Sequence, residues 1–114
     1  MAKIIVEVGS TCTKIDKYDV NGIKRIKEKT IQFKKHYNEE GKLSDIDVKE
    51  LIDCINEIKC MFEDIYICGT SIFRNLNVEE KESFLSRFKK ETEFDFNIIS
   101  QEKENELTVF GATR

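Results

Sequence analysis

The sequence predicts an α/β fold with a mixed five-stranded sheet, in the element order β-β-β-α-β-α-β-α. Three observations support this prediction. Apolar strands end in small polar residues at Gly9 and again at Gly69. Between these two points the sequence has a hairpin-turn signal and then the pattern of an amphipathic helix. The chain has 114 residues, and we expect all of it, residues 1–114, to form a single domain.

The first three strands are predicted to be consecutive and antiparallel. Residues 4–8 form a β-branched run, and residues 13–20 can return beside it. Asn21-Gly22 is the sequence signal of a type I′ turn, which needs two residues with positive φ. Residues 23–33 then predict a third, outer strand.

A polar connection and a long helix follow the three strands. Residues 34–43 lack an apolar period, so a surface connection is predicted, and His36 is assigned no role because no ligand partners surround it. Ser44 followed by Asp47 is typical of a helix start. The apolar stripe of the helix consists of Val48, Leu51, Ile52, Ile55, Ile58 and Phe62.

The second half of the chain alternates strands and helices. Residues 65–68 predict a buried strand, residues 72–76 a helical turn, and Asn77 the cap of another helix. Residues 94–99 predict the last strand and residues 101–111 a terminal helix. Helices between strands imply right-handed parallel crossovers, so the first strand should have parallel neighbours on one side and the hairpin on the other.

Composition excludes several classes of function. Lys and Arg number 19 against 22 Asp and Glu, and this net charge of -3 does not indicate a nucleic-acid surface. No apolar run is long enough for a membrane span and no signal-peptide pattern is present, so a cytoplasmic protein is expected. The four cysteines form no CxxC pair and are expected to be free thiols. The lack of proline and the excess of Lys, Glu and Ile suggest a bacterial coding sequence.

Three polar segments are expected at one edge of the sheet: residues 9–14, 69–74 and 100–104. Ligands of such sheets bind beyond the carboxyl ends of the parallel strands, where all three segments would emerge. A phosphate requires backbone N–H groups, hydroxyls and a cation, and the first segment offers all of these. The hydroxyls and the cation belong to Ser10, Thr11, Thr13 and Lys14. A plain strand, glycine turn and second strand is the alternative that this spacing leaves open.

The three segments resemble motifs of the exopolyphosphatase and guanosine pentaphosphate phosphohydrolase (Ppx/GppA) family. The first family motif, Asp-Ile-Gly-Ser-Asn-Ser-x-Arg, is similar to residues 7–14. The second begins Thr-Ser-Ala-x-Arg and is similar to residues 70–77, and the third, Ile-Ser-Gly-x-Glu-Glu-Ala-Arg-Leu, resembles residues 99–107. The family belongs to the actin-like ATPase superfamily, so the resemblance implies a ribonuclease H-like fold.

The resemblance also implies roles for individual residues. Glu104 would be the catalytic carboxylate that orients or deprotonates the attacking water, Arg74 would bind phosphate, and Glu7 would lie near a Mg²⁺ ion. The remaining phosphate-binding residues would be Gly9, Ser10, Thr11, Thr13 and Lys14.

Among the positions that depart from the family motifs, four matter most. Glu7, Cys12, Gln101 and Glu106 stand where the family has Asp, Ser, Gly and Arg. These departures bear on catalytic competence. The first segment is also close to the loop of 2-hydroxyacyl-CoA dehydratase activators and of glutamate-mutase accessory proteins, which share the superfamily.

The family closes its active site between two lobes, and these 114 residues contain no second Asp-x-Gly-Gly loop. The resemblance therefore implies an N-terminal lobe that is inactive alone and becomes an exopolyphosphatase-like phosphoric anhydride hydrolase when a second lobe completes it. Its ligand would be polyphosphate or a nucleotide phosphate such as a guanosine polyphosphate. Two alternatives are a half-domain of an ATPase activator and a non-catalytic binding module that dimerises through an apolar patch including Phe73 and Phe110.

Overall fold

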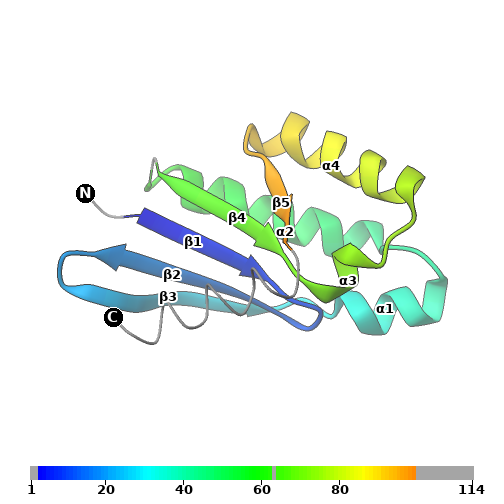
Figure 1. Ribbon diagram of the computed structural model, residues 1–114, viewed down its shortest axis with the longest axis horizontal. Coiled ribbons are helices and arrows are strands. Elements are labelled where there is room, and N and C mark those ends of the chain that lie inside the picture. The colour runs from blue at the N-terminus through cyan, green and yellow to red at the C-terminus, as the bar shows by residue number, and fades with distance from the viewer. Residues whose placement is uncertain (1–2, 63, 100–114) are drawn as a thin grey trace.

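The computed structural model describes residues 3–62 and 64–99, which form a five-stranded mixed sheet with helices packed on one face (Figure 1). The strands are β1 (Lys3–Val8), β2 (Cys12–Asp19), β3 (Gly22–Thr30), β4 (Ile65–Gly69) and β5 (Phe96–Ile98). Their order is β3-β2-β1-β4-β5, with β1 antiparallel to β2 and parallel to β4. The predicted pairing of the first strand is therefore confirmed.

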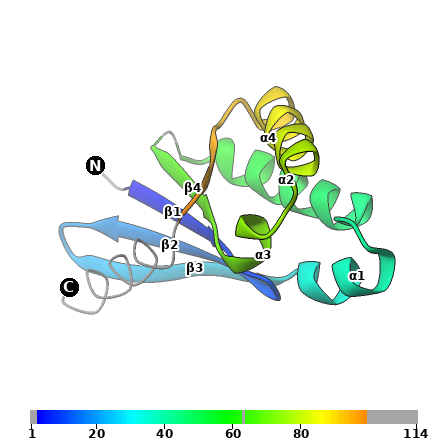
Figure 2. The same cartoon turned by 45° about the vertical axis from the view of Figure 1, so that its right-hand side comes forward.

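The helices of the described residues are α1 (Phe33–Glu40), α2 (Asp45–Lys59), α3 (Ser71–Arg74) and α4 (Val78–Thr92). Figure 2 shows them to one side of the sheet. Two right-handed crossovers in the same direction, from β1 to β4 and from β4 to β5, place their helices on the same face. The predicted terminal helix at 101–111, and Phe110 with it, lie outside the described residues.

Strand alternation builds the core. Ile4, Val6 and Val8 of β1 are fully buried, and the register places Ile15 and Ile67 directly beside Val6. The apolar stripe of α2 covers this row, since its residues from Val48 to Ile58 belong to the same buried cluster. Period-two and period-3.6 patterns thus meet in one core, as the sequence predicts.

The β2–β3 turn differs from the predicted type I′ turn. Asp19 pairs with Gly22, so Val20 and Asn21 are the central residues, and neither has a positive φ. The positive φ falls on Gly22, at 117°, and the Asp19 side chain accepts a 2.8 Å hydrogen bond from the Asn21 backbone N–H. The Asx contact stabilises Asn21 at negative φ. Gly22 is therefore the residue of this turn that takes a positive φ.

The predicted third strand is too long, and most of the predicted surface connection is a helix. The two predictions covered residues 23–33 and 34–43. β3 ends at Thr30, and α1 begins at Phe33 and ends at Glu40, where Gly41 caps the helix with a φ of 76°. This helix buries one side chain, Phe33, and packs Tyr37 partly against the core. Two apolar residues four apart are too few to produce a detectable helical period.

The two long helices begin where the sequence predicts. Ser44 is the N-cap of α2, although its side chain makes no capping hydrogen bond. Asn77 caps α4, and its side chain accepts a 2.8 Å hydrogen bond from the N–H of Glu80. Cys54 of α2 is buried at 1% exposure.

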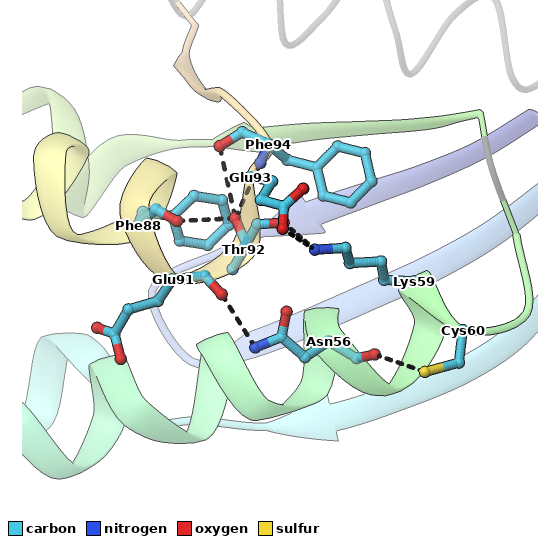
Figure 3. A network of polar contacts seen from close by, with 8 residues as sticks. All are labelled: Asn56, Lys59, Cys60, Phe88, Glu91, Thr92, Glu93 and Phe94. Atoms are coloured by element: carbon cyan, nitrogen blue, oxygen red, sulfur yellow. Dashed lines mark hydrogen bonds and ion pairs between the residues drawn. The ribbon is translucent and has the colours of Figure 1, made fainter.

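The C-terminal ends of α2 and α4 are joined by polar contacts (Figure 3). Lys59 of α2 donates a 3.0 Å hydrogen bond to the carbonyl oxygen of Thr92, in the last turn of α4. Asn56 donates to the carbonyl oxygen of Glu91 at 3.3 Å. A cation and an amide from α2 therefore satisfy carbonyl groups that the end of α4 leaves without helical partners.

An aromatic cluster fills the space between the sheet, α3 and α4. Phe73 is fully buried, with its ring centroid 4.8 Å from that of Phe96, 5.2 Å from that of Phe84 and 5.3 Å from that of Phe33. The apolar dimerisation patch expected around an exposed Phe73 is therefore wrong for that residue. The ring is used inside the lobe, where it joins α1, α3, α4 and β5.

Candidate functional site

Three parallel strands of the sheet end in one row. Val8 at the end of β1 pairs with Gly69 at the end of β4, and Gly69 pairs with Ile98 at the end of β5. In Figure 1 the arrowheads of β1 and β4 end near α3, with α1 close by. This is the carboxyl edge at which sheets of this kind bind ligands.

The turn between β1 and β2 is tighter than the predicted loop at 9–14. It contains Gly9, Ser10 and Thr11 only, because β2 already begins at Cys12. The Gly9 N–H donates a 2.9 Å hydrogen bond to the carbonyl oxygen of Cys12, and a Cβ at Gly9 would lie 3.0 Å from that oxygen. Glycine at this position lets the chain reverse closely at the edge.

Thr70 joins the second polar segment to the first. Its N–H and its hydroxyl both donate to the carbonyl oxygen of Val8, at 3.1 and 3.3 Å. Its own carbonyl oxygen accepts the N–H groups of Phe73 and Arg74, at 3.0 and 3.3 Å. The end of β1 and the start of α3 therefore form one hydrogen-bonded unit.

Arg74 extends this unit to the end of β5. Its half-buried guanidinium donates a 2.8 Å hydrogen bond to the carbonyl oxygen of Ile99. The Ile99 N–H in turn donates to the carbonyl oxygen of Gly69 at 3.1 Å. An arginine held in this way presents a fixed positive charge, since its guanidinium stays protonated.

Two predicted site residues lie away from this turn. Thr13 on β2 is fully buried toward the helices. Lys14, the next residue, is exposed on the other face, directly between Glu7 of β1 and Glu28 of β3. Strand alternation separates these side chains, because β2 begins before them. Glu104 lies outside the described residues.

Glu7 is half-buried and its cross-strand neighbours are Lys14 and Cys68. Within residues 3–62 and 64–99, no three His, Cys, Asp or Glu side chains group closely enough to hold a metal ion. Glu7 is thus a single carboxylate one residue before the end of β1. It fits Mg²⁺ only in the mode where substrate phosphates supply most of the remaining ligands.

Cys12 stands where the family motif has serine. Its thiol donates a 3.2 Å hydrogen bond to the Glu28 carboxylate. Burial raises the pKa of the Cys12 thiol, and the Glu28 contact raises it further. Because the thiolate is the reactive form, Cys12 is suited to a structural place beside the turn and not to nucleophilic chemistry.

The buried hydroxyl of Thr13 is expected to lower the stability of the fold. Its hydroxyl is fully buried and has no hydrogen-bond partner among residues 3–62 and 64–99. We expect Thr13→Val to raise the free energy of unfolding by about 1–2 kcal/mol, because an unsatisfied buried hydroxyl is removed. Urea unfolding measures the change, with Thr11→Val at the exposed turn as the control expected to stay within about 0.5 kcal/mol of the parent. A loss of stability in Thr13→Val would contradict this account.

Two contacts near this edge were not predicted from the sequence. The backbone N–H of Lys34, in the first turn of α1, donates a 3.0 Å hydrogen bond to the carbonyl oxygen of Ser10. His36, to which the sequence assigns no role, lies 2.7 Å from the Asp47 carboxylate, measured from Nδ1 to Oδ2. The sequence could not predict the His36–Asp47 contact, because the two residues are eleven positions apart and this spacing is not typical of any one helix or strand.

The part of the chain that the structure describes has no helix long and apolar enough to cross a membrane. Its four cysteines, Cys12, Cys54, Cys60 and Cys68, form no disulfide bond with one another.

Comparisons with known proteins place the chain in a family. The model of the Ppx/GppA phosphatase family matches residues 13–114. No curated protein sequence matches the chain. Among solved structures, a Ppx/GppA family member from Aquifex aeolicus is 21% identical with a TM-score of 0.73, and the match covers 91% of this chain and 36% of that one. An exopolyphosphatase from Cytophaga hutchinsonii is 16% identical with a TM-score of 0.75, over 94% of this chain and 36% of that one.

The present chain therefore spans little more than a third of the length of the solved structures that it resembles. At these identities the likeness shows the fold, a mixed five-stranded sheet with helices packed on one face. The family match extends over most of the chain, from the second strand onward. The chain belongs to the Ppx/GppA phosphatase family.

Proposed function

We propose that this chain is the N-terminal, phosphate-binding lobe of a phosphohydrolase that removes terminal phosphate from polyphosphate or a guanosine polyphosphate. The lobe offers one side of the site, and a second lobe closes it. Family membership supports the reaction class, and the carboxyl edge of the sheet supports the location.

The observation that carries the proposal is the hydrogen-bonded unit at that edge. Thr70 is bonded to the end of β1, and Arg74 is bonded to the residue after β5. Phosphoryl transfer depends on charges and donors that are already in place, because reorganising them during the reaction raises the barrier. A planar guanidinium also matches two phosphate oxygens at once.

Catalysis requires groups beyond this unit. By resemblance to the family, Glu104 is the proposed catalytic carboxylate that orients or deprotonates the attacking water. A half-site open to water weakens each charge contact several-fold, so the 114-residue chain alone should bind phosphate without turnover. Closure by a second lobe would exclude water and complete the site.

Mg²⁺ is the proposed cofactor, and Glu7 is the residue of this chain that would hold it. The ion would offset the charge of the phosphate oxygens. A single carboxylate is sufficient when phosphates supply further oxygens, which makes metal binding dependent on the substrate. The cysteines form no disulfide bond with one another, which fits the reducing cytosol that we propose as the compartment.

The test uses tripolyphosphate as the probe and Arg74→Gln as the variant. We expect tripolyphosphate to bind the chain in calorimetry, and its affinity to fall at least about tenfold in Arg74→Gln, since a charge-assisted contact is lost. The matched control is Arg87→Gln, because Arg87 of α4 is a half-buried arginine that is paired with Asp45 of α2 and Glu91 of α4. Equal affinity in both variants would overturn the role of Arg74.

Turnover is checked separately by phosphate release. The chain alone should release no phosphate from polyphosphate, and a polypeptide that also carries a second lobe should do so only with Glu104 intact. Undiminished release in Glu104→Gln would remove Glu104 from the mechanism. Measurable release by the isolated chain would show that a second lobe is not needed.

A further inference from the structure

The helix α1 has little intrinsic stability. It is eight residues long, buries only Phe33, and its N-cap residue Gln32 makes no side-chain capping bond. Its charges oppose the helix dipole, because Lys34 and Lys35 lie in the first turn and acids lie in the last. A helix of this length would not persist without tertiary contacts.

Two polar contacts hold α1 in place. The Lys34 N–H donates to the carbonyl oxygen of Ser10 in the β1–β2 turn at 3.0 Å. Two residues later, the His36 ring contacts the Asp47 carboxylate of α2 at 2.7 Å. The first contact connects α1 to the candidate phosphate site, and the second connects α1 to the core helix of the lobe.

The His36–Asp47 pair is specific because one of its partners is buried. The Asp47 side chain is only 5% exposed, whereas that of His36 is 39% exposed. A buried carboxylate needs a hydrogen-bond donor, and the His36 ring nitrogen meets this need. α2 is itself fixed by its apolar stripe, so the pair ties a weak helix to a rigid one.

We propose that His36 and Asp47 are positioning residues for the phosphate-binding turn. The pair fixes α1, and α1 fixes Ser10 through the backbone of Lys34. The turn at residues 9–11 is thereby held in one conformation before the ligand arrives. This inference deepens the proposed function and rests on it for its consequence in phosphate binding, but the mechanical connection stands on contacts of its own.

The experiment compares four variants of the full chain. His36→Ala removes the ring nitrogen that contacts Asp47. In His36→Asn the amide nitrogen is bonded to Cγ, as Nδ1 of histidine is, so it can preserve the contact. Asn38→Ala is the matched control on an exposed position of α1. A double variant, His36→Ala/Asp47→Ala, removes the pair without leaving a buried carboxylate unpaired, so the test does not depend on the folding of the single variant.

Amide hydrogen exchange of Lys34 reports the tether without any ligand. We expect exchange at Lys34 to be about tenfold faster in His36→Ala and in the double variant, and near the parent rate in His36→Asn and Asn38→Ala. Exchange at Ile55 in the core of α2 should stay unchanged in the double variant. Unchanged exchange at Lys34 in both loss variants would overturn the proposal.

Calorimetry with tripolyphosphate then tests the consequence for binding. We expect affinity to fall about threefold to tenfold in the two loss variants and to be restored in His36→Asn. If the parent chain does not bind tripolyphosphate, the proposed function fails, while the exchange result still decides whether the pair holds the turn. Faster exchange with unchanged affinity would overturn the role in binding.

Discussion

Replacing Phe73 with alanine is expected to lower the free energy of unfolding by about 3–5 kcal/mol, the range for a buried phenylalanine. The ring is fully buried and lies within aromatic contact of Phe33, Phe84 and Phe96. No other described aromatic side chain joins α1, α4 and β5 in this way. Its loss therefore removes both buried area and the edge contacts between rings.

Urea unfolding followed by circular dichroism measures this change. Phe73→Leu is the graded control, because it keeps much of the buried volume and should cost about 1–2 kcal/mol. Equal stability of Phe73→Ala and the parent would show that the cluster is not a main support of the fold. Because Arg74 follows Phe73 directly, phosphate affinity should fall together with stability in the alanine variant.

Gly69→Ala is expected to destabilise the chain by about 3 kcal/mol through overpacking. A Cβ at this position would lie 2.5 Å from Cζ of Phe96 and 2.8 Å from Cδ2 of Phe73. Both rings are buried, so neither can turn into solvent. Gly69 also pairs with Val8 and Ile98 in the sheet, which prevents the backbone from moving away.

A double-mutant cycle separates this clash from other effects. Phe96→Leu removes ring atoms from the space that the new methyl group requires, so Gly69→Ala/Phe96→Leu should be less destabilised than the sum of the two single variants. Chemical denaturation of the four proteins supplies the data. Simple additivity would mean that the added methyl group does not meet the ring of Phe96.

The topology of the sheet was predictable because its signals are strong and repeated. Val8 and Gly69 each end an apolar run, and the stripe of α2 lies between the two runs. α1 was not predictable, since a helix that fully buries only Phe33 leaves no periodic pattern. The turn at Asn21-Gly22 was predicted with the wrong type, because a side-chain contact from Asp19 decides which residue takes positive φ.

The candidate site was predictable as a location and less so as a set of side chains. Segments following β1 and β4 do meet at one edge, as parallel strands require. The residues assigned from the first segment separate, because β2 begins at Cys12 and alternation sends Thr13 inward and Lys14 to the opposite face. Cys-Thr-Lys has no pattern that fixes where a strand begins, so the spacing alone could not show this.

The central position of β1 in the strand order also separates the chain into an early and a late part during folding. β1, β2 and β3 pair through contacts that are local in sequence, so this meander can form once the chain through Thr30 is available. The β1–β4 pairing joins residues far apart in sequence and must wait for α2 and for the closure of a long loop. We therefore expect the edge that carries the candidate site to assemble late in folding, when β4 and β5 dock beside a strand that already has its other neighbour.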